Sequence, residues 1–151
     1  MITIKRALET DIPVLVSFQE RMAFETEGIS LDVSILTAGM RALFANPEKG
    51  CYFVAVNDAK VVASLLITYE WSDWRNRTIY WIQSVFVDPV HRRKGIYSQM
   101  YQYIQALVDK DDSIGGIRLY VDRTNINAQQ TFLGKKPKTF SFSAICSSVE
   151  S

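Results

Sequence analysis

The stretch that decides the fold reads VDPVHRRKGIYS and spans residues 87–98. A β-rich run ends at Asp88-Pro89, because proline has no N–H to give to a strand ladder. Gly95 then precedes a segment with helical periodicity, and three consecutive cations, Arg92, Arg93 and Lys94, lie in the turn. The first N–H groups of a helix have no helical partners and carry a partial positive charge, so this turn is suited to bind an anion. Gly95 favours that interpretation because it has no Cβ to keep a phosphate at a distance.

The same residues could instead form a solvated basic turn in front of a helix, and the physics of the turn leaves both interpretations open. Two familiar phosphate loops are excluded. The P-loop pattern Gly-x-x-x-x-Gly-Lys-Ser/Thr is absent. The three-glycine fingerprint of dinucleotide-binding folds is also missing.

Outward from this loop, the sequence alternates between strand and helix patterns. Upstream, β-rich runs predict strands over residues 2–5, 51–56, 61–69 and 78–87, with a tight hairpin turn at 57–60. Apolar spacings of three and four predict helices over about 11–28 and 32–46. Downstream, we expect a helix over 96–108, a strand over 117–122, a short helix over 125–133 and a last strand over 139–146. This order predicts one α/β or α+β domain with a mixed sheet, covering residues 1–151.

Composition narrows the function classes. The net charge of +1 gives no reason to expect a nucleic-acid partner. One histidine and two distant cysteines, Cys51 and Cys146, argue against a metal site and favour reduced thiols. No apolar run approaches the ~20 residues of a membrane span, and no signal-peptide core opens the sequence. These patterns predict a cytoplasmic protein with no membrane partner.

The loop and its flanks resemble a known family. Arg92-Arg93-Lys94-Gly95-Ile96-Tyr97 is similar to the Arg/Gln-x-x-Gly-x-Gly/Ala motif of the GNAT superfamily of N-acetyltransferases. The strand and turn Val85-Phe86-Val87-Asp88-Pro89 also resemble those that precede the motif in the family. Downstream, Leu119-Tyr120-Val121 followed by Asn125-x-x-Ala128 resembles the next strand and helix start. The resemblance covers about residues 1–133.

The resemblance implies a central mixed, mostly antiparallel sheet flanked by about four helices, and transfer of an acetyl group from acetyl-CoA to a primary amine of a small molecule or peptide. The strand at Val85, Phe86 and Val87 would splay from its neighbour and pair with the pantetheine arm. Its amides would also polarise the thioester carbonyl. The loop would hold the pyrophosphate, and Asn125 would bind the pantetheine or hold the loop. The expected cofactor-binding residues are therefore Val85, Phe86, Val87, Arg92, Arg93, Lys94, Gly95, Ile96, Tyr97, Ser98 and Asn125.

The sequence departs from the family pattern at three places. Tyr97 stands where the family has Gly or Ala, and we expect its side chain to point away from the phosphates, toward Tyr101. Phe132 stands where many members have a tyrosine that protonates the departing thiolate, so the alternative function is a CoA-binding module with weak or no catalysis. Residues 134–151 are atypical, with one strand in place of the usual final pair, and a frameshift is a hypothesis for their origin.

The acceptor side is predicted less sharply. An attacking amine must lose its proton, so a base or a positioned water is expected. Gln83 lies where several family members have a carboxylate and could position a water, and Glu70 is a candidate base. Asp73, Glu25 and Glu27 are further carboxylates expected near the acceptor cleft. Aromatic residues concentrated over 69–81 could pack the sheet, line an acceptor pocket or form a homodimer surface.

Overall fold

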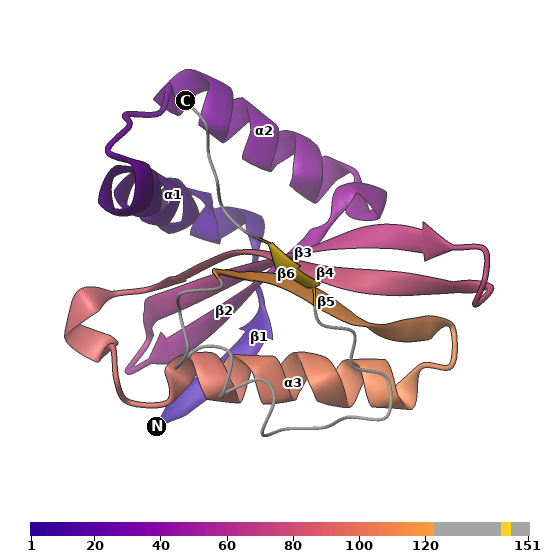
Figure 1. Ribbon diagram of the computed structural model, residues 1–151. Helices are drawn as coiled ribbons and strands as arrows, with labels where there is room; N and C mark the ends of the chain where they lie inside the picture. Colours follow the sequence, from indigo (N-terminus) through magenta and orange to yellow (C-terminus); the bar gives the residue numbers. More distant parts are fainter. Residues whose placement is uncertain (123–142, 146–151) are drawn as a thin grey trace.

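A mixed sheet runs through the middle of the molecule, with α3 on one face and α1 and α2 on the other (Figure 1). The computed structural model describes residues 1–122 and 143–145. In these residues the strands follow the same order in space as in the chain. They are β1 (Ile2–Arg6), β2 (Cys51–Asn57), β3 (Lys60–Ser72), β4 (Arg77–Val87), β5 (Ile114–Asp122) and β6 (Ser143–Ile145). The first four pair antiparallel, and the β4–β5 and β5–β6 pairs are parallel.

The helices are α1 (Ile12–Glu27), α2 (Val33–Ala45) and α3 (Ile96–Lys110), with single 3₁₀ turns at Glu9–Asp11, Pro47–Lys49 and Pro89–His91. The mixed, mostly antiparallel sheet and these helices confirm the predicted fold class. The helix predicted over 125–133 lies outside the described residues. Residues 143–145, inside the strand predicted over 139–146, are the short strand β6.

Local sequence explains where the elements begin and end. Gly28 ends α1 with a φ of 66°, the left-handed conformation that glycine adopts without strain. Asp32 begins α2, because its carboxylate accepts hydrogen bonds from the N–H groups of Ser34 at 2.9 Å and Ile35 at 3.2 Å. Asp58 and Ala59 both have positive φ in the two-residue turn between β2 and β3, which is the twist a tight hairpin needs. The predicted hairpin turn is confirmed.

Apolar side chains cover both faces of the sheet. On the α3 face, Met100 and Ile104 are fully buried against strand residues such as Leu65. On the other face, Leu15 of α1 and Met40 of α2 pack over β2. These two clusters fix the sheet between its helices, and the β4–α3 connection therefore has a rigid support on either side.

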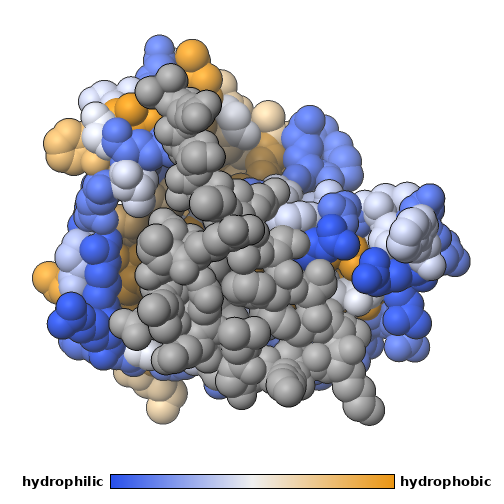
Figure 2. All heavy atoms as spheres, in the orientation of Figure 1, coloured by the Kyte–Doolittle hydropathy of each residue, from blue (hydrophilic) through white to orange (hydrophobic). Residues whose placement is uncertain are grey.

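The apolar spacing within 32–46 predicts one buried stripe on α2 from Val33 to Phe44, and this stripe is exposed at its first residue. Val33, the first residue of the helix, is 47% exposed, while Leu36, Leu43 and Phe44 are partly buried and Met40 is buried. Figure 2 shows hydrophobic residues at the surface in this upper region, where Phe24 and Ile35 are also exposed. No helix in the described part of the chain is long and apolar enough to cross a membrane.

The thiol of Cys51, at the start of β2, is partly buried, and its reactivity can test this burial. Its thiol is free, partly buried and 3.6 Å from the Tyr52 carbonyl. Burial raises the pKa of the Cys51 thiol, and the nearby Arg6 opposes this only in part. A raised pKa means that less thiolate is present at any pH below it. In a Cys146→Ser variant, we therefore expect the alkylation rate of Cys51 to have its pH midpoint above 9.0, the ordinary value. A midpoint below that value, measured with iodoacetamide across pH 7–11, would contradict the burial.

Candidate cofactor and active site

The strands β4 and β5 separate where the site begins. Their parallel pairing runs only as far as Ile82 and Leu119, while β4 continues to Val87. On the other side of β4, Ile67 pairs with Ile82 and Leu65 pairs with Val85, so β4 has one residue more than β3 in this interval. Such a bulge bends and twists a strand. The structure therefore leaves an open β4 edge, as expected for the splay.

The backbone of this open edge has a definite direction. The Asp88 N–H donates to the Val62 carbonyl of β3 at 2.9 Å. Backbone groups alternate between the two sides of an antiparallel strand, so those of Val85 and Val87 point away from β3 and into the gap. An extended ligand could pair with this edge as another strand would.

The loop after β4 is shaped by its own residues. The Asp88 carboxylate accepts a hydrogen bond from the Val90 N–H and begins the 3₁₀ turn Pro89–His91. Arg93 and Gly95 then adopt left-handed conformations, with φ of 63° and 75°. A Cβ on Gly95 would meet no heavy atom within 4 Å, so the space beside it is open. The N-terminus of α3 thus faces this space with the positive end of its helix dipole, where the first N–H groups have no carbonyl partner within the helix.

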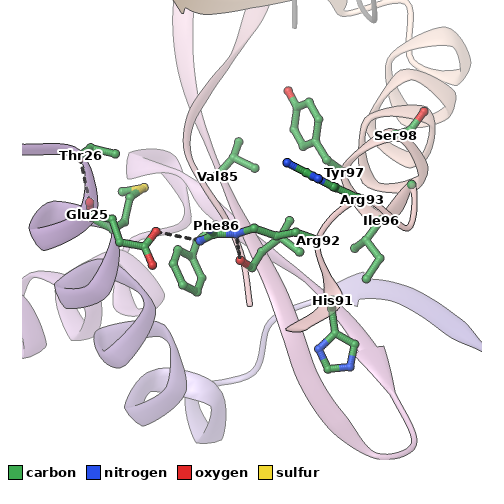
Figure 3. A pocket seen from close by; sticks show the side chains of 13 residues that line it. Glu25, Thr26, Val85, Phe86, His91, Arg92, Arg93, Ile96, Tyr97 and Ser98 are labelled. Carbon is green, nitrogen blue, oxygen red and sulfur yellow. Dashed lines mark hydrogen bonds and ion pairs between the residues drawn. The ribbon is translucent and has the colours of Figure 1, made fainter. Parts of the chain in front are cut away.

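The open edge, the loop and α1 enclose one pocket of about 710 Å³ (Figure 3). Nine of the eleven predicted cofactor-binding residues line it: Val85, Phe86, Val87, Arg92, Arg93, Gly95, Ile96, Tyr97 and Ser98. Lys94 is exposed and does not line it. Asn125 lies outside the described residues. A pocket of this size is typical of a site for a cofactor-sized ligand.

Three of the lining residues come from α1, and sequence reasoning did not assign them to a cofactor pocket. Met22, Glu25 and Thr26 lie in the last turns of that helix and line the pocket, and Figure 3 shows Glu25 on the side that faces Arg92. Their spacing of three and four is visible in the sequence, but this spacing alone does not show which surface they face. His91 also lines the pocket, with a buried Nδ1 that has no hydrogen-bond partner among the described residues.

Tyr97 lines the pocket and also packs on the core cluster beneath α3, with Tyr101 as a neighbour. The packing expected between these two tyrosines is compatible with this position, and the direction of the side chain relative to a phosphate stays a prediction. Side chains in a helix tilt toward its N-terminus, which brings a residue of the first turn over the loop. Burial, and secondarily the neighbouring Tyr101, raise the pKa of Tyr97 far above its ordinary value, so its hydroxyl stays protonated.

The two candidate catalytic residues do not line this pocket. Gln83 is exposed on β4 and donates a hydrogen bond to the Thr68 hydroxyl at 2.9 Å. The Glu70 carboxylate accepts from Trp81 Nε1 at 3.2 Å and forms an ion pair with Arg118 at 2.9 Å. Glu70 is therefore engaged by Trp81 and Arg118 in a small polar group on the sheet and does not line the pocket.

The remaining acceptor-side candidates divide between two places. Glu25 lies in the pocket wall, whereas Glu27 lines none of the three main pockets. Asp73, Trp71 and Trp74 are exposed at the β3–β4 turn, at the far end of β4 from the pocket. The exposed tryptophans therefore cannot wall the same cavity, although they remain available as a surface.

Comparison with known proteins agrees with this architecture. Residues 18–134 match the model of the acetyltransferase (GNAT) family. A possible acetyltransferase from Clostridium difficile 630 has 42% sequence identity and a TM-score of 0.81, with 96% of this chain and 99% of that chain covered. No curated protein matches closely enough to count as a relative.

Two more distant structures share the fold. A predicted acetyltransferase from Clostridium acetobutylicum, solved with acetyl-CoA, has 20% identity and a TM-score of 0.70, covering 91% of each chain. An aminoglycoside acetyltransferase from an uncultured soil metagenomic sample, solved with sisomicin, has 19% identity and a TM-score of 0.71, covering 91% of this chain and 88% of that one. The matched family model spans most of the chain, over the same loop and splayed strands that form the pocket, and the chain belongs to the GNAT family of acetyltransferases.

Proposed function

We propose that this protein is an acetyl-CoA-dependent N-acetyltransferase acting on a primary amine of a small molecule or peptide. The observation that carries the proposal is the continuity of the pocket: the strand edge at Val85–Val87, which is not paired with β5 in the described residues, leads directly to the N-terminus of α3. A ligand with an extended amide-bearing arm and a diphosphate has the chemistry that this surface complements.

The residues of the chain take the following roles in the proposal. Backbone N–H groups of Arg93–Ser98 hold the diphosphate, and the backbone of Val85 pairs with the pantetheine arm. When bound, the cofactor would supply the acetyl thioester. N–H groups of the β4 edge would then be available to donate to the thioester oxygen and to stabilise its developing charge.

Deprotonation of the acceptor is assigned to water. Gln83 lies within the bulge of β4, between Ile82 and Val85, and can hold a water with its amide, but it has no basic group. Glu70 is engaged by Arg118 and Trp81, so we assign it to attraction of a cationic amine. Deprotonation through water needs no dedicated base close to the amine.

The solved relatives support the classes of ligand without specifying them. One carries acetyl-CoA on the same fold, and another carries an aminoglycoside, which bears several amines. Fold does not choose among acceptors. A cytoplasmic location and a homodimer remain predictions from the sequence.

Two measurements test the proposal. Titration calorimetry with acetyl-CoA should show one site per chain, with a Kd in the micromolar range typical of such cofactors. Thiol release in the presence of aminoglycosides, polyamines and short peptides should then exceed the rate without acceptor. Absence of acetyl-CoA binding would reject the cofactor assignment.

Phe132 favours a second candidate, a CoA-binding module with weak or no catalysis. A phenylalanine has no proton to give to a departing thiolate. This position lies outside the described residues, so the second candidate rests on the identity of the residue in the sequence. Acetyl-CoA binding without thiol release from any amine of the panel would select this candidate over the enzyme.

A further inference from the structure

The guanidinium of Arg92 is held on three sides by the protein (Figure 3). Its Nε donates to the Val87 carbonyl at 2.8 Å, and an Nη donates to the Glu25 carboxylate at 2.8 Å. Its Cζ atom also lies over the Phe86 ring, 5.4 Å from the ring centre. The side chain thus joins the end of β4 to α1, across 67 residues of sequence.

The partner surface on α1 is a single helix face. Phe18, Arg21 and Glu25 follow one another at spacings of three and four, so they project from the same side. Phe18 contacts the Phe86 ring at 4.8 Å, and the Arg21 guanidinium lies 5.0 Å from that ring. Arg21 also pairs with Asp88 at 3.6 Å. We name these residues, with Phe86, Asp88 and Arg92, the α1–loop clamp.

The clamp acts on the open edge of β4. The Val87 carbonyl points into the gap between β4 and β5, where it accepts the hydrogen bond from the Arg92 Nε. Arg92 therefore takes up the last hydrogen-bond acceptor of the free β4 edge. This contact holds the Val87 peptide in place, two residues after Val85. A ligand arm that pairs with this edge depends on where that peptide is held.

The next two cations are placed differently. Arg93 lines the pocket, and Arg93 and Lys94 are both exposed. In the part of the chain that the structure describes, neither side chain has an ion pair or a hydrogen bond. Their charges are free to meet a phosphate, whereas the guanidinium of Arg92 is already engaged.

We infer that Arg92 is a positioning residue rather than a phosphate ligand, and that Glu25 is its partner in holding the β4 edge for the pantetheine arm. Recognition of the cofactor phosphates then falls to Arg93, Lys94 and the backbone N–H groups. This inference rests on the proposed binding of acetyl-CoA.

A positioning role for Glu25 and a purely electrostatic role predict opposite changes in cofactor affinity when Glu25 is neutralised. Glu25 places a carboxylate in the wall of a pocket that would take an anionic cofactor. If charge alone mattered, neutralising Glu25 would strengthen binding. If Glu25 positions Arg92, neutralising it weakens binding.

The experiment compares two ligands by calorimetry: acetyl-CoA, and 3′-phosphoadenosine 5′-diphosphate, which carries the phosphates without the pantetheine arm. The variants are Glu25→Gln, Arg92→Lys and their double variant, with Arg93→Gln and Glu27→Gln as references. Arg92→Lys keeps the charge but cannot reach Val87 and Glu25 together from one planar group. Thermal unfolding of each variant verifies that it is folded.

We expect Glu25→Gln and Arg92→Lys each to weaken acetyl-CoA binding about fivefold to tenfold, the equivalent of one hydrogen bond. Their effects should not add in the double variant, because both break one contact. Both should leave the affinity for the fragment unchanged. Arg93→Gln should weaken the binding of both ligands and reduce the dependence of Kd on salt. Glu27→Gln should leave the affinity for both ligands unchanged.

Three results would overturn the inference. The first is tighter acetyl-CoA binding by Glu25→Gln. The second is unchanged acetyl-CoA affinity in Arg92→Lys. The third is an equal loss of affinity for both ligands in Arg92→Lys. A wild-type chain that bound neither ligand would reject the proposed function and this inference with it, which separates that failure from the other three.

Discussion

Gly95→Glu should reduce acetyl-CoA affinity at least about a hundredfold, the largest effect expected from any single change in the loop. Gly95 has a φ of 75°, and its missing Cβ faces open space in the pocket wall. A glutamate there would put a carboxylate where the diphosphate is proposed to bind, against like charge. Because no protein atom lies within 4 Å of the new Cβ, the fold should lose only the strain of the left-handed conformation, about 1 kcal/mol.

Gly28→Glu provides a matched control for that variant. Gly28 also has a left-handed φ, of 66°, and open space around its missing Cβ, but it does not line the cofactor pocket. Its loss of stability should be similar, and its acetyl-CoA affinity should stay close to that of the wild type. Equal affinities of wild type and Gly95→Glu in titration calorimetry would show that the loop is not the phosphate site.

The largest expected effect on stability is that of Ile104→Ala in α3. Ile104 is 0% exposed and packs against the β-sheet in the main apolar cluster. Removing three carbon atoms from a close-packed interior loses their burial and leaves a cavity, which costs about 2–5 kcal/mol of unfolding free energy. Urea denaturation measures this as a lower midpoint with an unchanged slope.

Gln102→Ala is the control on the same helix. Gln102 is exposed, and alanine is a good helix former, so the unfolding free energy should change by less than about 0.5 kcal/mol. If Ile104→Ala were as mild as Gln102→Ala, α3 would not be the helix that covers this face of the sheet. The pocket would then lack its support, since the loop is anchored by the first turn of α3.

Local patterns in the sequence predicted much of the fold. Asp88-Pro89 ended a strand, Gly28 and Asp32 ended and began helices, and the turn at 57–60 closed a hairpin, each through the backbone preferences of a few neighbouring residues. Periodicity predicted Ile96, Met100, Ile104, Leu107 and Val108 as the buried side of α3; four of them are 3% exposed or less, and Leu107 is partly buried. It missed Tyr101, because a tyrosine is as common on a surface as in a core.

Periodicity failed where burial depends on what lies beneath an element. Val33 fits the apolar stripe of α2, but as the first residue of the helix it is 47% exposed. Likewise, the sequence left sheet packing, an acceptor pocket and a dimer surface open for the aromatic residues over 69–81. In the structure Trp71, near the end of β3, and Trp74, in the turn after it, are exposed and away from the pocket. Hydrophobic periodicity shows which residues are apolar, but it does not show how far the neighbouring helix or sheet extends.

The sequence by itself determined the chemistry of the loop at residues 87–98: a strand that must stop, a glycine before a helix, and adjacent cations. Those features are local, because a helix end and a proline act over a few residues. Only the tertiary structure decided which of the cations is free. It placed Glu25 of α1 against Arg92 and left Arg93 in the pocket without an ion pair in the described chain. That choice depends on contacts between residues far apart in the chain, and these form only when packing brings their elements together.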